Sequence, residues 1–371
     1  MQRVKVEPRP DYAAKLEAQG LSFHARDAYW REDVCYRLTS AEVDTLEAAT
    51  QELHGMCMEA ARHLVRNRRL AELQIPAEFR DAIAASLERG GFSLYGRFDL
   101  LYDGSAPPKL LEYNADTPTA LLESAVCQWF WLEDCFPEAD QFNSIHERLI
   151  ARWKQLPGLG PVHLACLEDQ EEDWACTAYL RDTLTQAGRR CEQLSIEAIG
   201  WDPAGRNFVD LTGRPIQTLF KLYPWEWMMR EQFAPHLLQA GMTIIEPLWK
   251  SLLSCKGLLP VLWELYPGHP NLLPAYFKPD GLKAYARKPL YSREGANVTL
   301  VQADGSSTTT EGPYGAEGYV YQALAPVPEF DGVHPVIGSW LVNGEAAGIG
   351  IREDRAYVTS NTSQFVPHYF D

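Results

Sequence analysis

The sequence predicts an α/β protein of the α+β type, with N-terminal helices, a central α/β part and an antiparallel, β-rich C-terminal part. Three observations predict this class. Residues 39–66 place apolar side chains at helical spacing, and residues 162–186 resemble a strand followed by a helix. Residues 285–351 contain several strand-like runs, two of which flank Asn343-Gly344. At 371 residues, the chain can build a large core and several subdomains.

The first long element that we predict is a helix over residues 39–66. Thr39 and Glu42 have the spacing of a capping box, in which each side chain bonds the backbone N–H of the other residue. The apolar residues that follow share helical spacing: Val43, Leu46, Leu53, Met56, Ala60 and Leu64.

Residues 92–116 predict two strands joined at the loop DGSAPP. If the hairpin is centred on this loop, Asp99 lies opposite Glu112 and Arg97 lies opposite Asn114. Because side chains alternate between the faces of a strand, all four then share one face. The loop alone does not fix this register, and a slip of one residue would separate them. The other face holds apolar side chains, namely Phe98, Leu100, Tyr102, Leu111 and Tyr113.

The polar face of this hairpin is suited to a metal ion. Two carboxylates that face each other need a positive charge between them, which Arg97 or a divalent cation can supply. The oxygens of Asp99, Glu112 and Asn114 are hard ligands of the kind that Mg²⁺ or Mn²⁺ prefers. The alternative is a cross-strand salt bridge on a solvated face.

The residues after the hairpin predict a helix from Pro118 to about Cys135. Thr117 is a good N-cap, and proline suits the first helical position. The free N–H groups at the start of this helix would form an anion site beside the carboxylates. An ordinary capped helix is the alternative.

The remaining elements follow from strand and turn signals. A strand, VHLACL, precedes an acidic loop and a helix that runs to about Gln186 and closes at Gly188. Residues 190–250 are mixed, and their Trp-rich stretch LYPWEWMM is predicted to lie in the core or at an interface. YARKPLYSREGANVTLV and GYVYQAL predict strands, and Asn343-Gly344 predicts a type I′ hairpin turn.

Composition restricts the function. A formal net charge of −16 argues against nucleic acid, and suits either solubility alone or a cationic substrate. The N-terminus has no apolar stretch of a secretion signal, and no apolar run is long enough to cross a membrane. The eight cysteines form no CxxC pair, so their spacing supports neither zinc nor a disulfide framework. We therefore expect a cytoplasmic protein with reduced thiols.

Nucleotide motifs of the common kinds are missing. The chain contains no P-loop, and GIGIRE is only half of a dinucleotide-binding GxGxxG. Lys256 precedes an apolar run, and Lys288 lies in a strand that leads to the glycine-bearing loop SREGANV. Either ammonium could meet phosphates, and a surface position is the alternative for each.

The motifs RFDLLYD with LEYNADTPT, CKGLLPVLW, YARKPL with SREGAN, YVYQ and GIGIRED occur in one order. Together they resemble the synthetase domain of the glutathionylspermidine synthase family, and most closely its stand-alone acid–amine ligase type. The resemblance extends from about residue 20 to the end. It implies an ATP-grasp-like synthetase fold over residues 1–371, with no amidase domain. It also implies a ligase that joins a small-molecule acid to an amine through an acyl phosphate, with ATP and two Mg²⁺ ions as cofactors.

The resemblance also implies roles for particular residues. Arg97 and Arg352 fall at the reacting centre, and Asp99, Glu112 and Asn114 fall on magnesium ligands. The residues on the nucleotide side are Lys256, Lys288, Gly295, Tyr321, Gln322 and Ala323. The residues on the substrate side are Thr117 and Thr119 for the acid, and Glu171 and Glu172 for an amine such as a polyamine.

Some alternatives stay open at this point. Acidic residues at a helix N-terminus, such as Glu171 and Glu172, are also ordinary partners of the helix dipole. A family member without catalysis would bind nucleotide or a partner only. A magnesium hydrolase would leave the two lysines and Arg352 without a role. The sequence does not reveal the acid, the amine or the oligomeric state.

Overall fold

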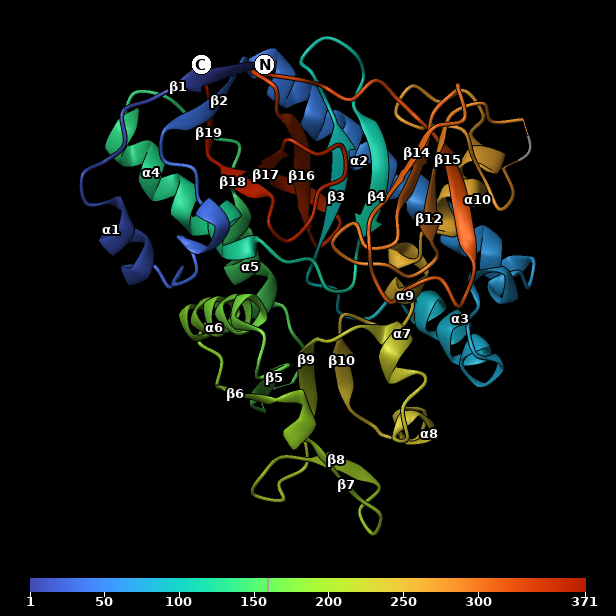
Figure 1. Cartoon of the computed structure of the whole chain (residues 1–371). Helices are drawn as coiled ribbons and strands as arrows, with labels where there is room; N and C mark the ends of the chain where they lie inside the picture. The colour runs from blue at the N-terminus through green and yellow to red at the C-terminus, as the bar shows by residue number, and fades with distance from the viewer. Residues whose placement is uncertain (159, 280) are drawn as a thin grey trace.

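A computed structural model describes residues 1–158, 160–279 and 281–371. The predicted hairpin lies inside a five-stranded sheet of order β18-β17-β16-β3-β4, which stands near the centre of the molecule (Figure 1). Its strands are β3 (Tyr95–Leu101), β4 (Lys109–Asn114), β16 (His334–Val342), β17 (Glu345–Asp354) and β18 (Gln364–Val366). β16 and β17 are joined at Asn343 and Gly344, which have φ angles of 54° and 79° and so form the predicted turn.

A second five-stranded sheet, of order β11-β15-β12-β13-β14, lies beside the edge strand β4 (Figure 1). All its neighbouring strands run antiparallel, as predicted for the C-terminal part. Its strands are β11 (Ala275–Tyr276), β12 (Tyr285–Pro289), β13 (Thr299–Val301), β14 (Ser307–Thr309) and β15 (Tyr319–Ala323).

The middle of the chain forms a parallel sheet of order β10-β9-β5-β6, with α6 (Glu171–Gln186) as the crossover between β5 and β6. The predicted strand and helix of residues 162–186 are confirmed, and Gly188 follows the helix with a φ of 76°. A small hairpin, β7–β8, projects below this sheet (Figure 1). The strands are β5 (Val162–Cys166), β6 (Cys191–Ser195), β7 (Gly200–Asp202), β8 (Asn207–Val209), β9 (Thr218–Leu222) and β10 (Thr243–Ile245).

The two ends of the chain meet in a three-stranded sheet, β1-β2-β19, made of β1 (Gln2–Lys5), β2 (Val34–Leu38) and β19 (His368–Phe370). The predicted long helix is α2 (Ser40–Arg66), and its capping box is present. The other α-helices are α1 (Tyr12–Ala18), α3 (Arg80–Arg89), α4 (Gln128–Cys135), α5 (Ile145–Lys154), α7 (Trp225–Met228), α8 (Ala234–Leu237), α9 (Lys250–Ser254) and α10 (Leu258–Leu265). Short helical turns occur at Arg26–Ala28, Leu70–Leu73, Ala77–Phe79 and Ile196–Ala198.

The prediction of a helix that starts at Pro118 is wrong. Residues 118–120 are not helical, and the helix begins at Leu121 with a π-helical turn, η4 (Glu123–Cys127), before α4. Ala120 has a φ of 61°, in the left-handed region that a residue with a Cβ rarely adopts, so the chain turns sharply there. Thr117 therefore caps no helix, and the expected anion site beside the carboxylates is absent at that position.

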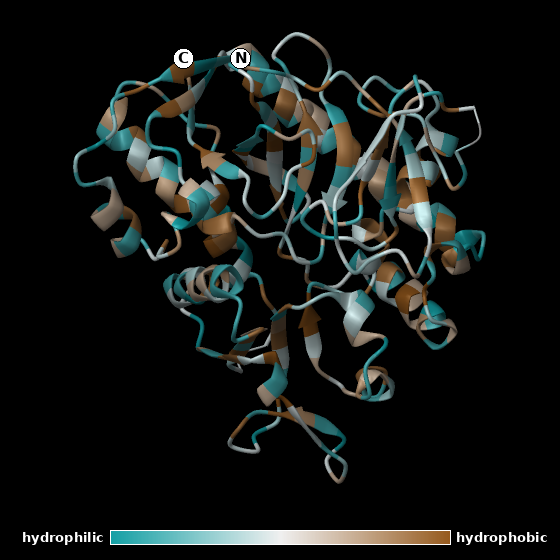
Figure 2. Ribbon diagram, viewed as in Figure 1, coloured by the Kyte–Doolittle hydropathy of each residue, from teal (hydrophilic) through white to brown (hydrophobic). Residues whose placement is uncertain are grey.

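The core is continuous through the helix α2, the central sheet and the helices α9 and α10. Many residues in the strands of the central and parallel sheets are hydrophobic, whereas the connecting loops are largely hydrophilic (Figure 2). In the stretch LYPWEWMM, Trp225, Met228 and Met229 belong to this core, as predicted. All eight cysteines are unpaired. Across the described ranges, no helix is both long and apolar enough to span a bilayer.

Candidate active site

A cavity of about 480 Å³ lies between the central sheet and the β12–β15 sheet. Seven of the residues that the sequence singles out line it, namely Asp99, Glu112, Lys256, Lys288, Gly295, Gln322 and Ala323. Its other walls are largely apolar, with Leu101, Leu111, Ala286, Val298, Leu300, Val327 and Val336 among them. An apolar slot that ends in charged groups can hold a flat ring with a polar, charged extension.

The register predicted for the hairpin is confirmed at its polar end. Asp99 pairs with Glu112 and Arg97 pairs with Asn114, so the four side chains share one face. Between Asp99 and Leu100 the register shifts by a bulge, and Leu100 pairs with Leu110. The placement of Leu111 on the apolar face is therefore wrong, because the bulge turns it into the cavity while Leu110 joins the core.

Asp99 is bonded to two arginines, Arg97 and Arg352. Its carboxylate accepts bonds from Arg97 Nε at 2.7 Å and Nη2 at 3.2 Å, and from Arg352 Nη2 at 3.2 Å. Asp99 is 4% exposed and Arg97 is 6% exposed, so the salt bridge is not on a solvated face. Burial lowers the pKa of Arg97, but Asp99 outweighs it and leaves that pKa raised, so the guanidinium stays charged.

Glu112 and the two lysines form the second charged group. Lys256 Nζ lies 2.9 Å from Glu112 Oε2, and Asn114 Nδ2 donates to Glu112 Oε1 at 3.0 Å. Burial alone would raise the pKa of Glu112, but the nearby ammonium groups of Lys256 and Lys288 hold it at about 2. Both lysines are more than nine-tenths buried, so the alternative of surface positions is wrong for both.

Lys288 is held on the inner face of its sheet. Its ammonium donates to Gln322 Oε1 at 2.7 Å and to the carbonyl of Leu111 at 3.1 Å. Burial lowers its pKa to about 8, although Glu112 acts in the opposite direction. Lys288 and Gln322 thus connect the two sheets at the floor of the cavity.

Of two further residues predicted to bind the nucleotide, Gly295 lines the cavity and Tyr321 does not. Gly295 has a φ of 68°, and a Cβ there would collide with the carbonyl of Thr359, so only glycine allows this close approach. Tyr321 does not line the cavity; its ring packs at 5.5 Å against that of Tyr285, on the other face of the strand from Gln322. Only its backbone can face the cavity edge.

The loop after the hairpin is fixed by charged side chains. Arg97 Nη1 donates to the carbonyl of Thr119 at 2.6 Å, and Arg293 Nη1 donates to Thr117 Oγ1 at 2.7 Å. Asp116, which is 2% exposed, bonds to the fully buried Lys221 at 2.5 Å. Thr117 and Thr119 thus lie in a non-helical loop on the arginine side of the site, and the two arginines hold them there.

The acidic stretch at the start of α6 divides into two parts. Glu171 points outward, where it accepts a bond from Ser22 Oγ at 2.6 Å and pairs with Arg26. Glu172 is half-buried, and its charge adds to burial in raising the pKa of Glu123, Asp173 and Glu294, so it lies near these three carboxyl groups. The pKa of Glu123 and that of Asp173 are each raised to about 7.

This acidic cluster (Glu123, Glu172, Asp173 and Glu294) adjoins the arginine side of the site. Arg352 lowers the pKa of Glu123 and Glu294 through its charge, so it links the cluster to Asp99. Sequence reasoning assigned no role to Glu123, Arg293 and Glu294. For Glu123 a signal was present, since it is a lone acid in the apolar run ALLESAVC.

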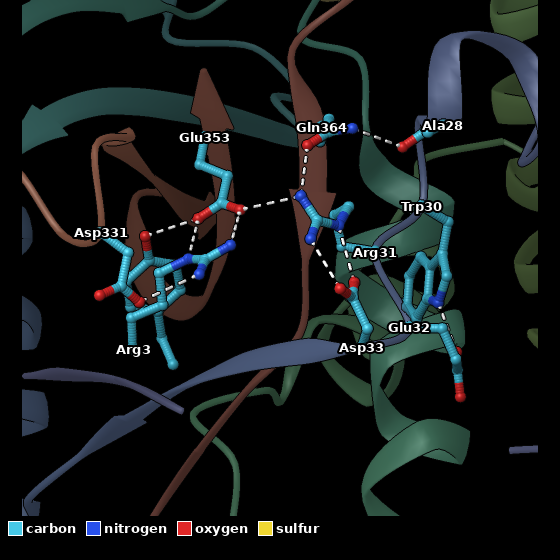
Figure 3. A network of polar contacts seen from close by, with 10 residues as sticks. Arg3, Ala28, Trp30, Arg31, Glu32, Asp33, Asp331, Glu353 and Gln364 are labelled. Carbon is cyan, nitrogen blue, oxygen red and sulfur yellow. Dashed lines mark hydrogen bonds and ion pairs between the residues drawn. The ribbon is translucent and has the colours of Figure 1, made fainter. Parts of the chain in front are cut away.

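Arg352 is positioned by the residue that follows it. Glu353 points to the opposite face of β17, where it is fully buried and accepts bonds from Arg3 Nε at 2.8 Å and Nη2 at 2.7 Å (Figure 3). The hydroxyl of Tyr36 donates to the same carboxylate at 2.8 Å. This bidentate pair anchors β17 to the N-terminal strands, and so fixes the face on which Arg352 lies.

The donor set suits magnesium. Asp99, Glu112 and Asn114 offer carboxylate and amide oxygens on one face, and two of them line the cavity. The lysines and arginines that now neutralise the carboxylates are the residue types that bind phosphate. The residues present therefore fit a nucleotide with its magnesium.

The fold is of the glutathione synthetase-like type. The chain superposes with a TM-score of 0.58 on a glutathione synthetase-like effector from Globodera pallida, which is 10% identical, over 99% of this chain and all of the other. The predicted ATP-grasp-like synthetase fold is thereby confirmed.

The family follows from the sequence comparisons. Residues 3–371 match the family model for the glutathionylspermidine synthase preATP-grasp region, so the chain belongs to the glutathionylspermidine synthase family. A protein of Haemophilus influenzae, provisionally named an acid–amine ligase, is 44% identical over the whole of both chains.

Two longer relatives are more distant. Trypanothione synthetase of Crithidia fasciculata is 27% identical over 85% of this chain and 53% of its own length. The bifunctional glutathionylspermidine synthetase/amidase of Escherichia coli is also 27% identical, over 90% of this chain and 58% of its own length. The chain thus spans little more than half the length of these two relatives, whose names describe ligases.

Proposed function

We propose that this chain is an ATP-dependent ligase that joins the carboxylate of a small acid to an amine. The observation that carries the proposal is the cross-strand pair Asp99 and Glu112. Lysines neutralise it on the cavity side, and arginines neutralise it on the opposite side. One row of side chains can therefore receive a phosphate chain at one end and a reacting carboxylate at the other.

The nucleotide end is the cavity between the two sheets. Its apolar walls fit a base, and Lys256 and Lys288 lie where the phosphates would enter. Asp99, Glu112 and Asn114 would hold magnesium, which neutralises phosphate charge. When bound, ATP supplies the phosphoryl group that turns the acid into an acyl phosphate, and ADP is the product.

The arginine end is proposed to hold the acid. Arg97 and Arg352 can bind the carboxylate and then neutralise the oxyanion that develops when the amine attacks it. Thr117 and Thr119, in the loop that Arg97 and Arg293 hold, are proposed contacts of the acid.

The acidic cluster beyond Arg352 is proposed to hold the amine. Glu172 and its neighbours place negative charge where an ammonium group would wait, in keeping with a polyamine or another cationic substrate. An ammonium must lose a proton before its nitrogen can attack. Glu123 and Asp173, each with a pKa near 7, are matched to accept that proton at neutral pH.

The proposal is tested by ADP release from the purified protein with Mg-ATP. A panel of acids that includes glutathione is crossed with a panel of amines that includes spermidine, for the wild type and for Asp99→Asn. We expect ADP release that requires one acid and one amine together, and its loss in the variant. Bound ATP without turnover for any pair would favour the alternative of a family member that binds nucleotide only.

A further inference from the structure

A cluster of polar side chains lies outside the site described above, on the parallel sheet. His163 on β5 and Glu192 on β6 are direct partners in the parallel register. Asp210 follows directly after β8, the second strand of the projecting hairpin. One potential ligand atom of each residue lies within 4.8 Å of the other two. Three segments that are distant in the sequence therefore bring an imidazole and two carboxylates together.

The imidazole of His163 has no partner to explain its burial. The residue is 2% exposed, and neither ring nitrogen has a hydrogen-bond partner among the described residues. A buried polar group without a partner destabilises the fold, so it points to a missing ligand. Because the ring lies beside two carboxylates, that ligand is expected to be a cation.

The separations in the cluster suit ligands of one ion. His163 Nε2 lies 3.6 Å from Asp210 Oδ2 and 4.0 Å from Glu192 Oε2, too far for hydrogen bonds. Two tetrahedral ligands with bonds of about 2.0–2.1 Å are separated by about 3.4 Å. Both distances from His163 are within about 0.6 Å of that spacing, and the two carboxylate oxygens lie within 4.8 Å of each other, so small side-chain movements would bring the three atoms onto a common ion.

Asp210 is already oriented for such a role. Its Oδ1 accepts bonds from Thr212 N at 2.8 Å, Thr212 Oγ1 at 2.7 Å and Arg214 N at 3.0 Å. These bonds hold the carboxylate in the turn, with Oδ2 3.6 Å from His163 Nε2, and Oδ2 itself accepts a bond from Arg214 Nε at 2.9 Å. The outer-sphere bonds that orient a metal-binding carboxylate have this form.

A cation of the chain itself now bridges the two carboxylates. Arg214 Nη2 lies 2.5 Å from Glu192 Oε2 and 2.8 Å from Asp210 Oδ2. The side chain of Arg214 is 57% exposed, so it can withdraw into solvent. Arg214 leaves both ring nitrogens of His163 without a partner, whereas a metal ion would bind one of them together with the two carboxylates.

We propose that His163, Glu192 and Asp210 form a binding site for a divalent transition metal such as Zn²⁺. Arg214 competes with the ion for the two carboxylates. The imidazole ligand favours zinc over magnesium, which prefers oxygen ligands alone. A bound ion would tie the β7–β8 hairpin to the β5–β6 edge of the parallel sheet. Its role is structural, and it is separate from the magnesium ligands of the proposed active site.

The test is zinc binding to metal-free protein, measured by competition with a chromophoric chelator in the presence of excess Mg²⁺. We expect one zinc site per chain and a higher melting temperature on binding. Glu192→Gln, at a half-buried position that tolerates change, should weaken binding at least tenfold. Arg214→Met should strengthen it, because the competing guanidinium is removed. That rise in affinity is the result that a merely structural salt bridge does not predict.

Two controls identify the binding groups. Cys191→Ser, next to Glu192 in the chain, should leave zinc binding unchanged, and so should Asp99→Asn in the proposed active site. His163→Asn should abolish zinc binding. If this variant of a buried residue does not fold, the two separate variants Glu192→Gln and Arg214→Met still decide the test. No zinc binding by the wild type, equal binding by Glu192→Gln, or loss of binding in Cys191→Ser would overturn the proposal.

Discussion

Lys288 provides the sharpest test of the nucleotide end of the site. Its ammonium is buried at the floor of the cavity and is bonded to Gln322 and to the carbonyl of Leu111. Replacing it by methionine keeps the length of the side chain and removes the charge. A charge-assisted hydrogen bond to a phosphate contributes about 1.5–3 kcal/mol. We therefore expect kcat/KM for ATP to fall roughly 10- to 150-fold, at about 1.4 kcal/mol for each tenfold change.

The pH profile separates this charge from a packing effect. Burial lowers the pKa of Lys288 to about 8, so in the free enzyme its positive charge is lost as the pH rises through 8. In the wild type, kcat/KM for ATP should fall above pH 8, by up to about tenfold for each further pH unit. In Lys288→Met this alkaline decline should be absent, because the methionine side chain has no ionisable group.

The assay is ADP release at saturating acid and amine, from pH 6 to pH 10, with the melting temperature followed in parallel. Arg287→Met is the matched control, because Arg287 lies on the other face of the same strand, over the ring of Tyr319 at 4.8 Å. It should leave kcat/KM for ATP unchanged. A wild-type kcat/KM for ATP in Lys288→Met, or an alkaline decline that persists in this variant, would contradict a phosphate contact of Lys288.

Three further outcomes are expected. Arg352→Ala should lower kcat roughly 100- to 1,000-fold with little change in ATP affinity, since it loses an oxyanion partner; a pure affinity defect by nucleotide titration would remove it from the reacting centre. Glu172→Gln should raise KM for the amine while Glu171→Gln does not, because only Glu172 belongs to the acidic cluster, whereas Glu171 pairs with Ser22 and Arg26; equal KM values would contradict this assignment. Asp116→Asn should lower the free energy of unfolding in urea by about 3–5 kcal/mol, because Lys221 is then buried without its counter-charge; unchanged stability would show that the pair is dispensable.

Local signals predicted a large part of the fold. The capping box at Thr39, the turn at Asn343-Gly344 and the hairpin register at Asp99 each depend on residues close in the sequence, and all three are confirmed. The period of two along a strand was sufficient to place the charged face of the site before any tertiary contact was known.

The errors have tertiary causes. The helix after the hairpin starts later than its N-cap signal because Arg97 and Arg293, from other segments, hold residues 117–119 in a loop. The outward position of Glu171 and the inward position of Glu172 depend on how α6 packs, which local sequence does not reveal. For the same reason no sequence motif marks the cluster around His163, because its three residues come from distant segments of the chain.

In the proposed reaction, the carboxylate of the acid is activated by phosphorylation before the amine attacks. The most direct test uses an acid labelled with ¹⁸O in its carboxylate, once a productive pair of substrates is found. The amide product and the released phosphate are then analysed by mass spectrometry. We expect each phosphate to carry one labelled oxygen from the acid, and ADP and amide to form in equal amounts. Unlabelled phosphate, or label found in AMP, would contradict it.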